Sequence, residues 1–201
     1  MSGLHPWVAA AARGGLPDWA VAREKRRAHA ARVAKLLQEW GKVRGEHPRD
    51  IERWTAVGYL HDVLRDADPV DLRAGLSRPL DQLPDEVIHG PAAADCLRQG
   101  GVTDEPLLTA IASHTLGSPN FDDIGKALYV ADFLEPGRKL QPKWRARLRD
   151  EMPEGLDTVA KAVVGKRIQF LIKKGRPVPP DTLGLWNVLA KGRSWASAFE
   201  V

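Results

Sequence analysis

Apolar residues recur along the chain at intervals of three and four positions, the spacing of residues that share one face of an α-helix. Val33, Leu37 and Trp40 form one such row, and Ile124 and Leu128 begin another. No window shows the sustained alternation of Val, Ile and Thr that a half-buried strand requires. We therefore predict an all-α fold.

Capping residues, prolines and glycines divide this pattern into helices. Asp18 is placed to cap a first helix that runs to about Trp40 and ends at Gly41, and a second helix is expected from Pro48 to Asp66. The remaining helices are expected after Asp68-Pro69, from Gly90-Pro91 to Gly100-Gly101, from about 103 to His114, from Asp122 or Asp123 to about Glu135, from 153 to 174, and from Thr182 to Leu189.

The length of the chain, 201 residues, is enough to bury one core of ordinary proportions, and the pattern contains no internal repeat. Its sharpest boundary is the stretch from Pro136 to Pro142. We predict a single domain over residues 1–201, with a helical bundle core over about 20–138 and a C-terminal helical extension over about 139–192.

Composition excludes several classes of protein. The single cysteine, Cys96, rules out an internal disulfide, and no stretch approaches the roughly 20 apolar residues of a membrane-spanning helix. The N-terminus MSGLHPWVAA does not resemble a secretory signal. The net charge of +4 is mild, and the basic runs at 23–27 and 143–149 lie in helical patterns, as expected of solvated helix faces. We expect a cytoplasmic protein with no nucleic-acid and no membrane partner.

Ionisable side chains interrupt the apolar helix faces. His29 precedes Val33 by four positions and His61 follows Val57 by four, so both rings are predicted to point inward, with Asp62 beside them. The same spacing, or a place at a helix entrance, turns three further groups toward the core: His89, His114 and Asp132.

Burying carboxylates and imidazoles costs several kcal/mol per ion unless the charge is compensated. A lone inward histidine is more often a core residue with a hydrogen-bond partner than a metal ligand, but groups of this kind on five separate helices favour one or two bound cations. Neutral imidazole and carboxylate suit Zn, Fe, Mn or similar ions. His5 and His47 lie in polar contexts beside prolines, so we expect them to take no part.

Six phrases of the sequence, in this order, are similar to a known family. They are RRAHAARVAKL (26–36), AVGYLHDVLR (56–65), VIHGPAAADCL (87–97), IASHTLGSP (111–119), YVADFLEPGR (129–138) and FLIKKGRPVPPDTLGLWNVLAKG (170–192). Together they resemble the HD-domain metal-dependent phosphohydrolase superfamily and, in their detailed wording, its YqeK family of symmetrical diadenosine tetraphosphate hydrolases.

The resemblance implies an HD-domain helical bundle and an enzyme that splits diadenosine tetraphosphate into two ADP by attack of metal-activated water. It implies two metal ions, with iron expected and Mn, Mg or Zn as alternatives. Two such ions can clamp phosphate oxygens and stabilise charge on the entering and leaving oxygens. The implied ligands are His29, His61, Asp62 and Asp132 for one ion, and His89 and His114 for the other, with Asp62 able to bridge.

The phosphates of such a substrate need cationic neighbours. Arg26 lies one helical turn before His29, and Arg65 lies one turn after Asp62. We expect Asp62 and Arg65 to be catalytic. The expected substrate-binding residues are Arg26, Arg65, Thr115, Gly117 and Arg138.

Four positions depart from the usual wording of the family. Arg65 stands where Lys is usual, Ala30 where Thr is usual, and Ser118 and Asn120 replace an Arg and a Gly. None of them is an implied ligand, so they bear on the substrate rather than on the metal. Another nucleotide or phosphate ester stays an alternative substrate, and a non-catalytic nucleotide-binding module stays an alternative function. The oligomeric state, including a homodimer, stays open.

Overall fold

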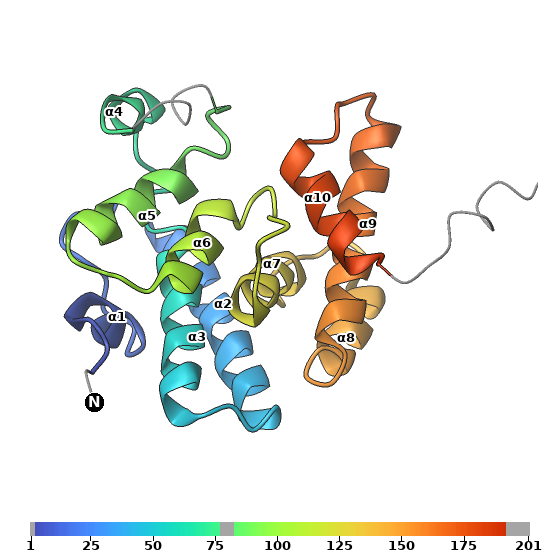
Figure 1. The fold of residues 1–201 in the computed structure, drawn as a ribbon, viewed down its shortest axis with the longest axis horizontal. Helices are drawn as coiled ribbons and strands as arrows, with labels where there is room; N and C mark the ends of the chain where they lie inside the picture. The colour runs from blue at the N-terminus through green and yellow to red at the C-terminus, as the bar shows by residue number, and fades with distance from the viewer. Residues whose placement is uncertain (1–2, 77–82, 192–201) are drawn as a thin grey trace, which may run out of the picture.

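The computed structural model describes residues 3–76 and 83–191, and every regular element within these ranges is an α-helix (Figure 1). The predicted all-α fold is confirmed. The helices are α1 (Pro6–Ala11), α2 (Glu24–Val43), α3 (Pro48–Leu60), α4 (Pro69–Ala74), α5 (His89–Gln99), α6 (Glu105–Ser113), α7 (Asp123–Leu134), α8 (Pro142–Glu151), α9 (Leu156–Lys173) and α10 (Pro180–Leu189).

Helices α2 and α3 lie side by side at the centre of the fold (Figure 1). Gly58 of α3 is so close to α2 that a Cβ at this position would come within 2.5 Å of Ala34 Cα. Gly41 packs in the same way against Ile51, whose Cγ1 would lie 3.2 Å from an added Cβ. Gly41 is therefore a packing residue inside α2, and the predicted helix end at Gly41 is wrong. The helix ends at Val43, and Gly45, with a φ of 71°, follows shortly after it.

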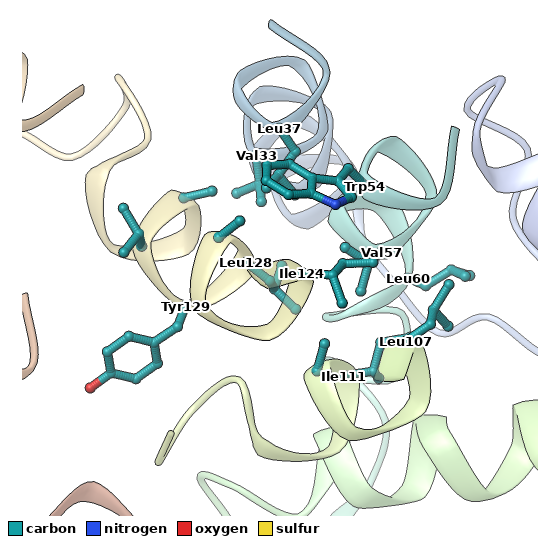
Figure 2. Close-up of a cluster of buried hydrophobic side chains, with 14 of the residues drawn as sticks. Val33, Leu37, Trp54, Val57, Leu60, Leu107, Ile111, Ile124, Leu128 and Tyr129 are labelled. Atoms are coloured by element: carbon teal, nitrogen blue, oxygen red, sulfur yellow. The ribbon is translucent and has the colours of Figure 1, made fainter. Parts of the chain in front are cut away.

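The hydrophobic core gathers side chains from α2, α3, α6 and α7 (Figure 2). Val33 and Leu37 meet Ile124 and Leu128 there, so the helical rows read from the sequence do face inward. Trp54 of α3 is also buried in this cluster. Burying one aliphatic side chain of this kind contributes about 1.5–3 kcal/mol, so the shared core fixes these four helices, which carry or precede most of the polar residues discussed below.

Helix α2 begins at Glu24, later than the start predicted at Asp18. Backbone hydrogen bonds tie the preceding segment to the turns that follow α3, because Val21 N donates to Val63 O at 2.9 Å and Asp66 N donates to Val21 O at 3.3 Å. These long-range bonds use backbone groups that a helix would need for itself, and the chain becomes helical only after them.

Helix α3 ends at Leu60, so the prediction of a helix continuing to Asp66 is wrong. Val63 N donates to Leu60 O, three positions back rather than four, and this tighter turn ends the regular helix. His61 and Asp62 therefore follow the helix instead of lying inside it. Residues 61–66 continue as turns.

The remaining predicted helices are present within a few residues of the expected bounds. Two short helices, α1 and α8, were not predicted individually. Helix α1 has only six residues, too few to show a periodic pattern, and the His5 ring caps it by accepting a hydrogen bond from Trp7 N at 3.3 Å. His47 caps α3 in the same way through Arg49 N.

Helix α9 packs against α7, and α10 packs against α9 (Figure 1). The C-terminal helices thus cover a helix of the bundle core, while the predicted division near residue 138 stays a prediction. Gly192, the last residue of the C-terminal phrase, lies outside the described residues. Among the described helices, none combines the length and the apolar character needed to cross a membrane.

Candidate metal centre

Asp62 lies at the centre of four histidines that come from separate parts of the chain. Its Oδ1 is 3.1 Å from Nε2 of His89 and 3.4 Å from Nε2 of His114. Its Oδ2 is 3.6 Å from Nε2 of His61 and 3.8 Å from Nε2 of His29. All five residues are buried. The fold therefore gathers a compact ionisable cluster inside an otherwise apolar interior.

Asp132 adds a second carboxylate from α7, with its Oδ1 3.2 Å from Nε2 of His29. Two groups of three residues each offer ligand-type atoms that lie within 4.8 Å of one another inside the group. One group is His29, His61 and Asp132, and the other is His61, Asp62 and His114. With His89 against Asp62, the structure brings together all six residues predicted as ligands.

Local hydrogen bonds orient two of the rings. Nδ1 of His61 lies 2.9 Å from Gly58 O, and Nδ1 of His114 lies 2.8 Å from Ile111 O. Because a carbonyl oxygen can only accept, we assign the ring proton to Nδ1 in both residues, which leaves the lone pair of Nε2 facing the centre. In each case the acceptor is three positions back, so the end of the preceding helix sets the ring orientation.

Glu135 orients a third ring, and the sequence analysis did not identify it. This residue is buried, and its carboxylate accepts from Nδ1 of His29 at 3.3 Å, from Nε of Arg32 at 2.6 Å and from Gly137 N at 2.6 Å. The proton on Nδ1 again leaves Nε2 of His29 free to face the centre. Its place in the phrase YVADFLEPGR, three positions after Asp132, was the available signal.

The chemistry of this cluster fits a bound metal ion. Nε2 of His29 and Nε2 of His61 are buried without a hydrogen-bond partner, although buried polar atoms are normally satisfied. Both nitrogens face carboxylates, and neutral imidazole with carboxylate is a ligand set that suits Zn, Fe and Mn. These residues could therefore hold one or more divalent ions.

The electrostatics of the centre favour the protonation states that a cation requires. Burial lowers the pKa of His61 and of His89 to about 4, so both rings are neutral at pH 7. Burial alone would raise the pKa of Asp62 and of Asp132, but the neighbouring histidines outweigh it and hold both well below the usual range. Burial lowers the pKa of His29, but the two carboxylates outweigh it and the pKa is raised. A proton and a metal ion compete for this nitrogen.

A cavity of about 510 Å³ opens beside His29. Arg26 and Arg138 in its wall both reach the centre, with Arg26 Nη1 2.9 Å from Asp62 Oδ2 and Arg138 Nη2 2.8 Å from Asp132 Oδ1. Concentrated positive charge of this kind attracts anionic ligands. We call this space the basic cavity, because the five cationic residues of its lining, Arg23, Lys25, Arg26, Arg32 and Arg138, outnumber its two carboxylates, Asp66 and Glu135.

Two other predicted substrate-binding residues lie next to the histidines. Arg65 is half-buried, and its positive charge adds to burial in lowering the pKa of His89. Thr115 Oγ1 lies 3.2 Å from Nε2 of His114. Thr115 thus lies beside the centre, and contact of Arg65 or Thr115 with a substrate stays a prediction.

The turn after Thr115 is shaped by packing. Gly117 has a φ of 84°, and a Cβ at this position would lie 2.7 Å from Leu185 Cδ2, so both the backbone and the neighbouring helix require glycine. Ser118 is buried, and its Oγ accepts a hydrogen bond from Asn120 N at 3.1 Å. A role of Gly117 in substrate binding stays a prediction.

Arg167 of α9 reaches the centre from the C-terminal helices, and the sequence analysis did not identify it either. Its Nη2 lies 3.5 Å from Asp132 Oδ2, and its Nη1 donates to Thr115 O at 2.7 Å. Its guanidinium lies 4.5 Å from the centre of the Tyr129 ring. No local signal distinguishes this arginine, because a cation on an amphipathic helix is ordinary.

Comparison with known proteins supports these observations. The model of the HD domain family matches residues 26–137. A protein named "Bis(5'-nucleosyl)-tetraphosphatase, symmetrical" from Halalkalibacterium halodurans is 29% identical over 172 residues, which cover 83% of this chain and 89% of that protein. A protein of the same name from Bacillus subtilis is 37% identical over 108 residues, which cover 53% of this chain and 57% of that protein.

A solved structure from Clostridium acetobutylicum, described as a "predicted HD superfamily hydrolase involved in NAD metabolism", superposes with a TM-score of 0.73. The superposition covers 93% of this chain and 98% of that one at 24% sequence identity, so it concerns the fold. The family model spans more than half of the chain and includes all six clustered residues. The predicted resemblance is confirmed, and the chain belongs to the HD domain family.

Proposed function

We propose that this protein is a metal-dependent hydrolase that cleaves diadenosine tetraphosphate symmetrically into two ADP. The observation that carries the proposal is the position of Asp62, whose two oxygens lie within 4 Å of Nε2 of four histidines. The relatives from H. halodurans and B. subtilis, whose names state this activity, support the choice of substrate.

The metal assignment is part of this proposal. His29, His61, Asp62 and Asp132 would hold one ion, His89 and His114 would hold the other, and Asp62 would bridge them. Iron is proposed for both positions, with Mn, Mg or Zn as alternatives, and the combination of imidazole and carboxylate suits Fe, Mn and Zn. When bound, such a pair activates water and neutralises charge on phosphate oxygens.

The protein supplies the binding and orientation. Arg26 and Arg138 present guanidinium groups from the basic cavity to the same centre, where they can hold phosphate oxygens by paired hydrogen bonds. Arg65 would add charge from the side of His89. Because these cations are held by the fold before substrate arrives, they stabilise developing negative charge with little reorganisation.

Metal analysis and product identification test the proposal together. Protein purified without added metal should contain close to two equivalents, and its only nucleotide product from diadenosine tetraphosphate should be ADP. Production of ATP and AMP would contradict symmetrical cleavage. Turnover that persists unchanged after complete removal of metal would contradict the proposed centre.

A second candidate keeps the enzyme class and changes the substrate to another nucleotide or phosphate ester. It is favoured by Ser118, which stands where the family usually has an arginine and therefore offers a phosphate no positive charge. The Ser118 hydroxyl already accepts a hydrogen bond from Asn120 N. Relative kcat/KM across a nucleotide panel distinguishes the two, and tight binding without any turnover would indicate a non-catalytic module instead. Homodimer formation and a cytoplasmic location stay predictions.

A further inference from the structure

A second cavity, of about 440 Å³, lies between the C-terminal helices and the segment that joins α7 to α8. We call it the C-terminal cavity. Its volume falls within the range of about 300–1,000 Å³ that is usual for small-molecule sites. Its lining includes Phe133, Leu140, Phe170, Leu171 and Pro179.

Two of these apolar side chains are exposed. Phe170 is 59% exposed and Leu140 is 73% exposed, although they come from different segments and line the same space. Folding gains little from apolar groups left in water, whereas a flat aromatic ligand placed between them would cover both. The aromatic ring of Phe170 offers the kind of face on which a nucleobase stacks.

The C-terminal cavity is linked to the candidate metal centre through residues that line it. Arg138 lines both this cavity and the basic cavity, and it pairs with Asp132. Arg167 and Thr115 also line the C-terminal cavity, and Arg167 lies 3.5 Å from Asp132 while Thr115 follows His114 in the chain. A ligand in the C-terminal cavity can thus extend charged groups past two arginines to the centre.

The polar groups of the C-terminal cavity match a nucleotide. Its lining contains the cations Arg138, Arg145, Lys166 and Arg167 and no carboxylate. Gln141 also lines it and, with a φ of 53°, is the single non-glycine residue with positive φ in the part of the chain that the structure describes. Residues in this costly backbone conformation gather at ligand sites. Its side-chain amide can both donate and accept, as the N6 and N7 edge of adenine requires.

From these observations we infer that the C-terminal cavity binds one adenosine of the dinucleoside substrate, so that its polyphosphate passes Arg138 and Arg167 toward the centre. The inference rests on the proposed function and adds a nucleoside site, most of whose lining residues lie beyond residue 137, where the match of the HD domain model ends. It also gives the centre one cavity on each side of Arg138, an arrangement suited to a substrate with a nucleoside at both ends.

Binding of a diadenosine tetraphosphate analogue with a methylene group between the second and third phosphorus tests this inference without turnover. Calorimetry on the metal-loaded protein should show that Phe170→Ala weakens binding by about tenfold, since a stacked base contributes on the order of 1–3 kcal/mol. Phe170→Trp, which keeps an aromatic face, should bind within about twofold of the wild type.

Ile172→Ala is the matched control, because Ile172 is 65% exposed on the same helix and does not line the C-terminal cavity. It should bind like the wild type. The methylene analogue of adenosine tetraphosphate should bind the wild type more weakly than the dinucleoside analogue, and Phe170→Ala should reduce this difference. Equal affinity of Phe170→Ala and wild type for the dinucleoside analogue would overturn the inference.

The two proposals fail in different ways. If the wild type releases ADP from diadenosine tetraphosphate but Phe170→Ala binds the analogue as tightly as the wild type, the proposed function stands and the inferred nucleoside site is overturned. If Phe170→Ala weakens binding of the analogue but the wild type does not cleave diadenosine tetraphosphate, the proposed function is overturned and the nucleoside site stands.

Discussion

Nδ1 of His29 donates a hydrogen bond to Oε1 of Glu135 at 3.3 Å, although the two residues are 106 positions apart. This bond joins the first helix of the central pair to the end of α7. It also decides which nitrogen of His29 faces Asp132 and Asp62. The orientation of a proposed ligand therefore depends on a residue that is not itself one of the proposed ligands.

Replacing this partner should weaken metal binding. Glu135→Gln keeps the size of the side chain but removes the charge that holds His29 and Arg32, and loss of such an orienting partner typically costs 10–100-fold in metal affinity. Titration of chelator-treated protein with metal measures the change. Glu39→Gln, an exposed position on α2, is the control, and equal affinities of the two variants would show that Glu135 does not orient the centre.

Asp62→Ala should remove metal and activity together, because Asp62 lies against histidines proposed as ligands of both ions. Elemental analysis of the purified variant should find less than one equivalent, and hydrolysis should fall below detection. Asp150→Ala, at an exposed position of α8, should retain both. Full hydrolysis by Asp62→Ala would remove this residue from the proposed machinery.

Arg26→Met should lower kcat/KM by about 10–100-fold, since a hydrogen bond to a charged group contributes about 1.5–3 kcal/mol. Metal content should be unchanged, because a guanidinium cannot be a ligand. Arg27→Met is the control, as Arg27 is exposed and does not line the basic cavity. Loss of metal from Arg26→Met would indicate that Arg26 orients Asp62 instead of contacting phosphate.

Acid should destabilise the metal-free protein in a defined range of pH. Burial lowers the pKa of His61 and His89 to about 4 in the folded state, against about 6.5 when unfolded. The unfolded chain then binds more protons as pH falls from about 6.5 to 4, so the free energy of unfolding falls by up to about 1.4 kcal/mol per pH unit for each ring.

Other groups of the centre do not cancel this loss. The raised pKa of His29 stabilises the folded state, and this stabilisation is fully present below about pH 6.5. The lowered pKa values of Asp62 and Asp132 also stabilise it, and that stabilisation is lost only as pH falls below about 4. Urea denaturation of chelator-treated protein at several pH values measures the slope. His89→Gln should remove part of it, and a constant free energy of unfolding from pH 6.5 to 5 would contradict the assignment.

Metal removal should lower the melting temperature. An ion present at 100 times its Kd stabilises the folded state by about 2.7 kcal/mol. For a chain of this size, about 1 kcal/mol changes Tm by about 2–4 °C, so chelation should lower Tm by about 5–10 °C. Scanning calorimetry with and without chelator measures this difference. The Asp62→Ala variant should show no such change, and a chelator effect of equal size in that variant would place the stabilising ion elsewhere.

The helical class, and the faces of the helices that turn inward, follow from the order of residues alone. His29 shares a face with Val33 and Leu37, and Asp132 continues the row of Ile124 and Leu128, because helical periodicity is a property of neighbouring residues. Periodicity, together with a helix entrance for His89, predicts that all six clustered residues face the core. The phrases around them also indicated the family.

The tertiary structure decided what depends on contacts between distant segments. Long-range bonds to the turns after α3 delay the start of α2, and His61 and Asp62 follow α3 rather than interrupt it. Glu135 and Arg167 meet the centre only because α7 and α9 pack beside it, and the C-terminal cavity exists only where α9 and α10 meet the α7–α8 segment. Periodicity shows that a side chain faces inward, but only the packing of the helices decides which partner it meets there.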